Sequence, residues 1–292
     1  MEHRILILLL FYNRPTLVRN TLRSILRSNE HYANWELAFI DDSSPVPGKP
    51  IVEEVLADHL DKVRFYNSNM TVEEKVSTGG MLGALMNQAI RDSSADIGII
   101  LCDDDELVDN YLHNLNRFFN KRPRAKSCYC HVHEFVPGVE DTRFVDRTAN
   151  RFNAYTGPIN PISKVDASQV AWRLSINKDL GVWFREGRTR NLDGPFFTDL
   201  RHAAGRVRFA GVVGQYKGVS GTAMTNFLAE VAWAGKEIDA EASARTISRE
   251  HYLQMIASYR ARGLDGEADR ILEIAERIYG PIKGSEVDPS AS

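Results

Sequence analysis

Apolar runs of strand length alternate with amphipathic segments over the first 132 residues of the chain. The continuous apolar run at residues 5–11 predicts a strand covered on both faces, and further strands are predicted at residues 35–40, 63–66, 97–101 and 127–132. The segments with helical spacing lie between them, at a helix that opens at Pro15 and at residues 51–60, 81–91 and 110–120. This alternation predicts an α/β fold with a largely parallel sheet and right-handed crossovers.

The alternation weakens beyond residue 133, where a different organisation is expected. Residues 134–164 are rich in Pro, Gly, Asn and charged residues, which predicts long loops. Residues 165–220 contain short apolar segments at 170–176 and 207–213. Two amphipathic helices are predicted at 248–260 and 267–278. We therefore expect a main domain over residues 1–220, made of halves 1–116 and 117–220. A helical extension over 221–283 and a disordered tail over 284–292 follow.

Polar clusters follow three of the predicted strands. Tyr12, Asn13 and Arg14 come after the first strand, the run 41–44 (Asp-Asp-Ser-Ser) after the second, and the run 103–106 (Asp-Asp-Asp-Glu) after the fourth. Ligands of open α/β sheets bind at the carboxyl ends of the strands. The three clusters therefore predict a binding site at one edge of the sheet.

The four consecutive acidic residues at 103–106 have two interpretations. Carboxylates crowded at the end of an apolar strand are costly unless a cation neutralises them. Their hard oxygen atoms suit Mg²⁺ or Mn²⁺, and such ions commonly bridge carboxylates to substrate phosphates. The alternative is a solvated helix start, where acidic residues are also favoured.

The chain of 292 residues has the composition of a globular protein, and its formal net charge of −3 conceals an uneven distribution. Residues 1–116 hold 10 basic and 18 acidic residues, whereas residues 117–217 hold 18 basic and 9 acidic ones. The basic middle predicts attraction of an anionic partner, such as a charged glycan or a nucleic acid. Alternatively, some of its arginines pair with the acidic first half.

Cysteine usage and hydropathy bear on the compartment. The three cysteines are too few for a disulfide framework, and we expect them to be reduced in a cytoplasmic protein. The longest apolar run, residues 5–12, is far shorter than the roughly 20 residues that a membrane-spanning helix needs. A buried first strand is the better interpretation of that run.

Taken together, the clusters resemble a known family over roughly residues 4–220. A strand ending in Tyr-Asn-Arg-Pro, a strand ending in Ile-Asp-Asp-Ser-Ser and a strand ending in an acidic triplet occur in this order in family 2 glycosyltransferases of the GT-A fold. The segment 79–87 (Gly-Gly-Met-Leu-Gly-Ala-Leu-Met-Asn) is similar to that family's glycine-containing helix start. The segment 191–196 (Asn-Leu-Asp-Gly-Pro-Phe) is similar to the region of its catalytic carboxylates.

The resemblance implies a site for a nucleotide-sugar donor, most often a UDP-sugar. The donor-binding residues that it implies are Phe11, Tyr12, Asn13, Arg14, Asp42, Gly80, Asn87, Asp103 and Asp104. Asp41 is expected to support its loop from the side. The chain is thus expected to be a transferase rather than a protein that only binds sugars.

The resemblance also implies a divalent metal, Mg²⁺ or Mn²⁺, that bridges the donor diphosphate. Asp104 and Asp105 are the implied ligands, with Asp103 and Asp105 as the other register, since Cys102 stands where the family's acidic motif usually begins. The family often supplies a histidine ligand near the end of the catalytic domain, and residues 216–220 contain none. Lys217 in that segment is a candidate for contact with the diphosphate instead.

For the chemistry, the resemblance implies an inverting transfer with Asp193 as general base and Asp199 as the fallback. The implied acceptor side includes Trp172, Arg188 and Arg190, although core packing is an equal interpretation of Trp172. A hydroxylated base in DNA is one specific anionic acceptor that the basic middle would suit.

Two alternatives remain open from the sequence. The chain could be a sugar nucleotidyltransferase, although residues 12–16 lack the glycine-rich basic loop of that class. It could also be an inactive module that binds a nucleotide-sugar or a nucleic acid. The C-terminal helices are a candidate oligomerisation element in any of these cases.

Overall fold

The computed structural model describes residues 2–71, 74, 80–135, 155–162, 164–187 and 192–218, together with scattered positions between 253 and 282. The chain divides into two compact units, of which the first comprises residues 1–135 and 143–218 and the second residues 136–142 and 219–292. The predicted helices at 248–260 and 267–278 and the tail at 284–292 lie almost wholly outside the described residues. Everything below concerns the first unit.

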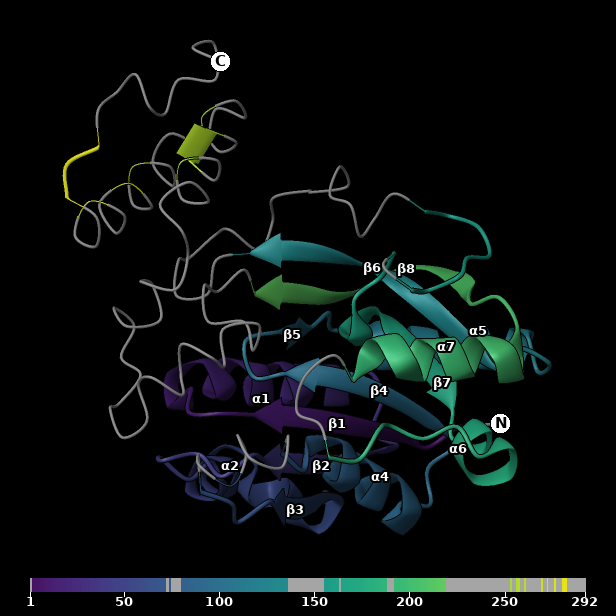
Figure 1. The fold of residues 1–292 in the computed structure, drawn as a ribbon, viewed down its shortest axis with the longest axis horizontal. Coiled ribbons are helices and arrows are strands. Elements are labelled where there is room, and N and C mark those ends of the chain that lie inside the picture. The colour runs from purple at the N-terminus through teal and green to yellow at the C-terminus, as the bar shows by residue number, and fades with distance from the viewer. Residues whose placement is uncertain are drawn as a thin grey trace. The chain divides into compact units, whose positions relative to one another are not determined.

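The first half of that unit builds the parallel part of an eight-stranded sheet (Figure 1). It contains strands β1 (Ile5–Phe11), β2 (Trp35–Asp41), β3 (Val63–Asn67) and β4 (Ile97–Cys102). β1 lies between β2 and β4, β3 lies outside β2, and all of these pairs are parallel. The predicted strands and crossovers of this half are confirmed.

The second half of the sheet is mixed. Its strands are β5 (Glu106–Leu107), β6 (Ser127–Phe135), β7 (Val170–Arg173) and β8 (Arg208–Gly218). The strand order is β3-β2-β1-β4-β7-β6-β8-β5. β7 is antiparallel to both of its neighbours and β5 is antiparallel to β8, whereas β6 and β8 are parallel. The expected fold class, an α/β sheet with flanking helices, is confirmed, with a larger antiparallel share than the sequence predicted.

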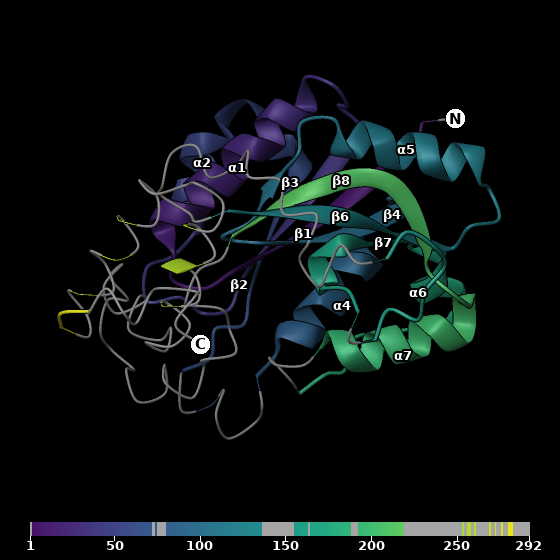
Figure 2. The ribbon, with the colours of Figure 1, turned by 90° about the horizontal axis from the view of Figure 1, so that it is seen from above.

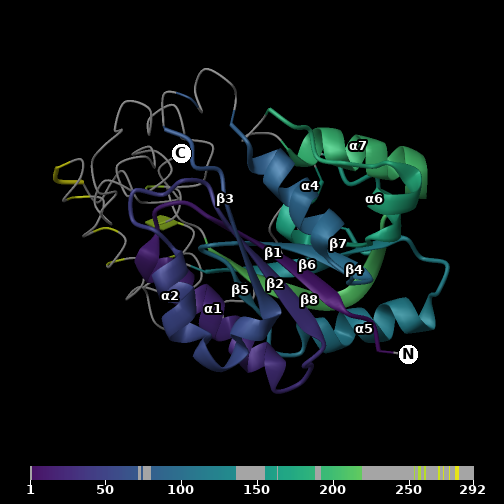
Figure 3. The ribbon, with the colours of Figure 1, turned by 90° about the horizontal axis from the view of Figure 1, so that it is seen from below.

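Helices cover both faces of the sheet, as the two views in Figures 2 and 3 show. One face carries α1 (Pro15–Asn29), α2 (Lys49–Val55) and α5 (Tyr111–Lys121), and the other carries α4 (Leu82–Asp92), α6 (Ser175–Leu180) and α7 (Asp193–Ala204). Residues of the central strands β1, β2 and β4 are therefore buried whichever face they point to, whereas the outer strand β3 leaves Arg64 and Phe65 exposed. Ile5, Leu6, Ile7 and Leu8 are each at most 2% exposed, which explains the unbroken apolar run that opens the chain.

Two helices differ from the sequence prediction. The segment predicted as one helix over 51–60 is α2 followed by the 3-10 helix η1 (Ala57–Lys62). The break occurs at the fully buried Leu56, whose φ of −108° and ψ of 28° leave the helical range. α7 was not predicted as a helix, although Pro195 in its first turn and the buried Phe196, Phe197 and Leu200 are helix signals.

The described residues bear on the predictions about membrane-spanning segments and disulfide bonds. None of the helices in that part of the chain is both long enough and apolar enough to cross a membrane. Cys102, Cys128 and Cys130 form no disulfide, and the last two are buried in the core. The cysteines therefore act as small apolar side chains rather than as covalent links.

Candidate active site at the carboxyl ends of the strands

The register of the sheet aligns the carboxyl ends of its first four strands. Phe11, the last residue of β1, is paired with Asp41 of β2, and Asp41 is paired in turn with Asn67 of β3. On the other side, Leu10 is paired with Cys102, the last residue of β4. The polar segments that follow these strands therefore meet at one edge of the sheet, as predicted.

Three residues at this edge adopt the left-handed backbone conformation although they are not glycine. Asn13 follows β1 with a φ of 49°, Ser43 follows β2 with 56°, and Asn69 follows β3 with 51°. Such residues cluster at sites where the surrounding structure holds them in place. The Asn13 N–H donates to Ser44 Oγ at 2.9 Å, and the Met70 N–H donates to Ser43 Oγ at 2.9 Å. Hydroxyl groups of one loop thus fix the backbone of its neighbours.

The two aspartates at the end of β2 make different contacts. Asp41 accepts hydrogen bonds from the backbone N–H groups of Ser44, at 2.8 Å, and Gly48, at 3.0 Å. It therefore supports its loop, as predicted. Asp42 is 3% exposed, and its Oδ1 accepts from Ser68 Oγ at 3.2 Å. Ser68 was not a candidate from the sequence, although the polar run 67–69 after β3 was a signal for it.

Asp103 joins the loop after β1 to the loop after β4. Its Oδ2 accepts from the Tyr12 backbone N–H at 2.9 Å, and its Oδ1 accepts from Arg14 Nη1 at 2.9 Å. Burial raises the pKa of Asp103 to about 6, against the opposing effect of the Arg14 guanidinium. Both carboxylate oxygens are engaged, so Asp103 holds Tyr12 and Arg14 in place rather than presenting a free ligand atom.

Asp104 and Asp105 lie on the turn between β4 and β5. Asp104 Oδ2 lies 3.0 Å from the same Arg14 Nη1. Asp105 is completely buried, and its Oδ1 accepts from the Gly218 N–H at 2.9 Å. Its Oδ2 has no hydrogen-bond partner within the described part of the chain. Burial raises the pKa of Asp105 to about 7, although the Lys217 ammonium acts to lower it.

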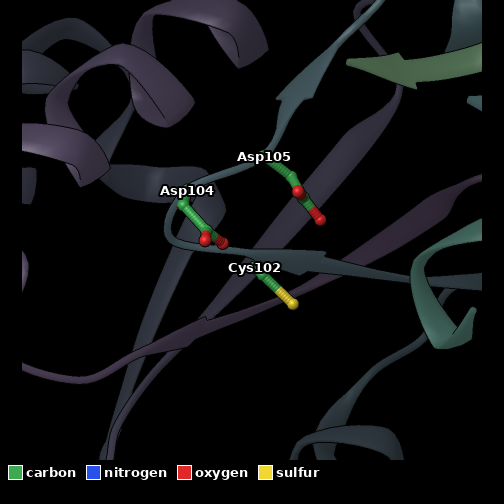
Figure 4. A group of neighbouring side chains, drawn as sticks. All are labelled: Cys102, Asp104 and Asp105. Atoms are coloured by element: carbon green, nitrogen blue, oxygen red, sulfur yellow. The ribbon is translucent and has the colours of Figure 1, made fainter. Parts of the chain in front are cut away.

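Cys102, Asp104 and Asp105 form a group that could hold a metal ion (Figure 4). Each offers one ligand atom, and these atoms all lie within 4.8 Å of one another. Burial raises the pKa of the Cys102 thiol well above its usual range, so the thiol is a neutral group beside the two carboxyl groups. Asp103 is not in the group. The geometry therefore favours the register of Asp104 and Asp105.

The charges around this group match a divalent cation. The charged side chains are Asp103, Asp104, Asp105, Asp166, Arg14 and Lys217. When all of them are ionised, the four carboxylates and two cations leave an excess of two negative charges, which one divalent ion would balance. Together with the unpartnered oxygen of the buried Asp105, this excess shows that the residues fit such an ion.

Lys217 and Asp166 complete the charged cluster, and Asp166 was not a candidate from the sequence. Lys217 Nζ lies 3.2 Å from Asp166 Oδ1. Burial disfavours the charged lysine, but Asp105 and Asp166 outweigh it and keep its pKa well above the ordinary value. Burial also acts to raise the pKa of Asp166, yet Lys217 and the Ser168 donors prevail and lower it. Both groups are therefore ionised near neutral pH.

Helix α1 fixes the acidic turn from the side. Thr21 Oγ1 donates to the backbone carbonyl of Asp103 at 3.0 Å, and Ser24 Oγ accepts from the Leu107 N–H at 2.9 Å. Arg27 forms an ion pair with Glu106 at 3.0 Å. Glu106 is thereby neutralised by a helix residue and does not add to the excess charge of the cluster.

Three of the predicted donor-binding residues have structural roles. The Phe11 ring packs on Phe39 in the core, with ring centroids 5.4 Å apart, so only its backbone reaches the loops. Asn87 exchanges two hydrogen bonds of 2.9 Å with the backbone of Phe184 and so anchors the segment after α6. Gly80 precedes α4 with a φ of 81°, a conformation that favours glycine.

Trp172 is a core residue. It is fully buried, its Nε1 donates to Asn177 Oδ1 at 2.8 Å, and its ring packs edge-on against Phe196, with centroids 5.1 Å apart. The prediction that it contacts an acceptor is wrong, because none of its surface is accessible. Core packing was the correct interpretation.

The two candidate bases lie on α7. Asp193 is the first residue of the helix and is partly exposed. Asp199 lies further along the helix, and its Oδ2 accepts from Arg185 Nη2 at 2.8 Å. This ion pair makes Asp199 the weaker candidate. The remaining acceptor candidates, Arg188 and Arg190, lie outside the described residues.

Comparison with known proteins was made by sequence and by structure. The family model described as glycosyl transferase family 2 matches residues 6–168, which is more than half of the chain. Comparison with the sequences of curated proteins finds no match.

Solved structures with a similar fold include TarS and a mannosyltransferase. TarS residues 1–349 from S. aureus has 12% sequence identity and a TM-score of 0.58, over 97% of this chain and 90% of that chain. It has also been solved with UDP and with UDP-GlcNAc. The mannosyltransferase PcManGT from Pyrobaculum calidifontis, in complex with GDP-Man and Mn²⁺, has 14% identity and a TM-score of 0.56, over 97% and 77% of the two chains. At these identities, the likeness shows the fold.

Proposed function

The chain belongs to glycosyltransferase family 2, and from this premise we propose that it transfers a sugar from a nucleotide-sugar, a UDP-sugar in the first place, to an acceptor hydroxyl. The observation that carries the proposal is the buried Asp105, whose Oδ2 has no partner among the described residues and lies in a cluster with two excess negative charges when all its groups are ionised. Such a cluster suits a divalent ion together with a diphosphate. Family membership also favours transfer over nucleotidyl transfer or binding alone.

The loops after β1, β2 and β3 are proposed to hold the nucleoside. The backbone N–H groups of Tyr12 and Asn13 donate to Asp103 and Ser44, and the Asp42 carboxylate accepts from the Ser68 hydroxyl. TarS in its complexes contains UDP or UDP-GlcNAc, and PcManGT contains GDP-Man, so both neighbours support a nucleotide-sugar donor. The partly exposed Tyr12 is the natural side chain to pack on the nucleobase.

Asp104 and Asp105 are proposed to hold the divalent ion, Mg²⁺ or Mn²⁺. The Mn²⁺ in the PcManGT complex supports this proposal. When bound, the ion would neutralise charge that develops on the departing diphosphate. Arg14 contacts both Asp103 and Asp104 and so places a cation beside the proposed ion, on the side of β1.

The proposed reaction inverts the configuration at the anomeric carbon. Asp193 takes the proton of the acceptor hydroxyl while the hydroxyl oxygen forms a bond to that carbon. The bond between the anomeric carbon and the diphosphate oxygen breaks at the same time, and the nucleoside diphosphate carries away the electron pair. Partial exposure of Asp193 at the start of α7 leaves its carboxylate accessible to an acceptor.

The acceptor is proposed to be anionic, either a charged glycan or a nucleic acid. Residues 117–217 have twice as many basic as acidic residues, and Arg201, Arg206 and Arg208 are exposed at α7 and β8. Binding of a DNA duplex or a sulfated glycan should weaken steeply with salt. If neither polyanion binds at 20 mM salt, where the Debye length is roughly two to three times its physiological value, the anionic acceptor is excluded.

Thermal denaturation with nucleoside diphosphates tests the donor and metal proposals together. UDP with Mn²⁺ should raise the melting temperature, and chelation of the metal should reduce the increase. Asp104→Ala should remove the metal-dependent part, whereas Asp58→Ala, which changes an exposed carboxylate on η1, should leave it intact. If no nucleoside diphosphate changes the melting temperature under any metal condition, the donor proposal is refuted.

A further inference from the structure

We propose that Lys217 is a built-in cation that binds the donor diphosphate directly, so that the site binds a nucleoside diphosphate even without a metal ion. This inference rests on the function proposed above and assigns a residue of β8 to the same site. The observations that carry it are the position of the ammonium, its unused hydrogen-bond donors and the rigidity of its anchor.

The backbone places Lys217 beside the metal-binding group. In the register of β5 and β8, Tyr216 is paired with Glu106, immediately after the acidic turn. Two residues after Tyr216, the Gly218 N–H donates to Asp105 Oδ1 at 2.9 Å. Lys217 is therefore fixed between two residues that contact the acidic turn, and its ammonium interacts with Asp105 and Asp104.

The ammonium has capacity left for a ligand. An ammonium carries three N–H donors. Within the described residues, the Lys217 ammonium makes one ion pair, with Asp166 Oδ1 at 3.2 Å. The side chain is 20% exposed, so it is open to solvent on one side, unlike Asp105, which has no exposed surface. A phosphate oxygen arriving at the cluster can therefore meet the two remaining donors.

The anchor of Lys217 is rigid. Asp166 caps the 3-10 helix η4 (Ala167–Gln169), and its Oδ1 accepts from the Ser168 N–H and the Ser168 hydroxyl at 3.1 and 2.9 Å. Gln169 completes the capping box and donates from Nε2 to the Cys130 carbonyl at 2.8 Å. A lysine held in this way binds a diphosphate with little further loss of side-chain freedom.

Titration calorimetry with UDP, in chelator and in Mn²⁺, tests the proposal without measuring activity. We expect wild type to bind UDP in chelator and Lys217→Met to bind it about tenfold or more weakly. The double variant Lys217→Met/Asp166→Asn removes the ion pair as a unit and should show the same loss, which guards against an effect of folding alone. Lys126→Met, which removes an exposed lysine at the start of β6, should bind like wild type.

The outcomes separate this inference from the proposed function. Equal binding of UDP in chelator by wild type and both Lys217 variants would overturn the role of Lys217 and leave the donor proposal standing. Binding of UDP by wild type only in Mn²⁺ would also overturn it, because the Lys217 ammonium alone would then not suffice to bind the diphosphate. Failure of wild type to bind any nucleoside diphosphate, with or without Mn²⁺, would overturn both.

Discussion

The affinity of the candidate site for Mn²⁺ should depend steeply on pH through Asp105. This carboxyl is completely buried, and burial raises its pKa to about 7. A carboxyl with a raised pKa holds its proton below that value, so Mn²⁺ must displace a proton in order to bind. With a pKa of about 7, roughly 90% of the groups are ionised at pH 8 but only about 3% at pH 5.5. We therefore expect affinity to fall about 30-fold between the two pH values.

Calorimetry measures this effect in two ways. The dissociation constant for Mn²⁺ should rise about 30-fold from pH 8 to pH 5.5. Repeating the titration in buffers with different ionisation enthalpies should show release of about one proton per ion at pH 5.5 and almost none at pH 8. Asp105→Asn should bind Mn²⁺ weakly at both pH values. Equal affinity of wild type at both pH values, without proton release, would refute the reasoning.

The same carboxyl should make the metal-free protein less stable at high pH. The folded-state pKa lies above the ordinary value, so stability is fully present below pH 3.8 and is lost as the pH rises through about 7. A pKa raised from 3.8 to about 7 corresponds to a loss on the order of 4 kcal/mol. Asp105→Asn should therefore raise the urea midpoint at pH 8 in chelator and change it little at pH 5, whereas Asp58→Asn should change neither. An equal effect of Asp105→Asn at both pH values would contradict this explanation.

Three further predictions concern the base, the core and a close helix contact. Asp193→Asn should retain UDP binding by calorimetry and lose sugar transfer by at least about 100-fold, as expected for a general base; transfer at the wild-type rate would move the base elsewhere. Trp172→Ala should lower the free energy of unfolding by about 3–5 kcal/mol in urea, because the fully buried ring leaves a cavity; a loss below about 1 kcal/mol would mean that the ring is accessible. Gly83→Ala should cost about 1–3 kcal/mol, since the added Cβ would lie 2.2 Å from the Arg185 carbonyl oxygen, whereas Gly194→Ala, where nothing lies within 4 Å, should be nearly neutral.

Local patterns were sufficient to predict the first half of the fold. β1, β2 and β4 are buried on both faces, so their largely apolar sequences identified them, and the helices between the strands carry apolar stripes. The direction of β7 depends on its pairing with β4 and β6, which are distant in sequence. Such pairings leave no local signal, which is why a largely parallel sheet was expected.

The position of the site at one edge of the sheet could be predicted from the sequence, but the different roles of its residues could not. Parallel strands bring their carboxyl ends together, so the loops after β1, β2 and β4 could be placed from the sequence. The role of Asp103 depends on Tyr12 and Arg14, about ninety residues earlier in the chain. Lys217 meets Asp166 only because β8 lies beside β6 and β5. The adjacent carboxylates therefore differ through long-range contacts that spacing alone cannot reveal.

Trp172 shows the limit of interpretation by residue type. A tryptophan near a presumed acceptor side fits both sugar stacking and core packing. The structure buries its ring against Phe184 and Phe196 and satisfies its N–H with Asn177. Because β7 is a central strand of a sheet that carries α6 and α7 on one face and α5 on the other, both of its faces are buried, and this placement was decided by strand order rather than by the local sequence.

A nucleotide-sugar hydrolysis screen tests the central claim most directly. Wild type would be incubated with UDP- and GDP-sugars in Mn²⁺ and in chelator, and release of the nucleoside diphosphate would be measured. We predict slow release from at least one nucleotide-sugar, faster with Mn²⁺ than in chelator, abolished in Asp104→Ala and retained in Asp58→Ala. No release from any nucleotide-sugar, or the same release in Asp104→Ala as in wild type, would contradict a donor site at the carboxyl ends of these strands.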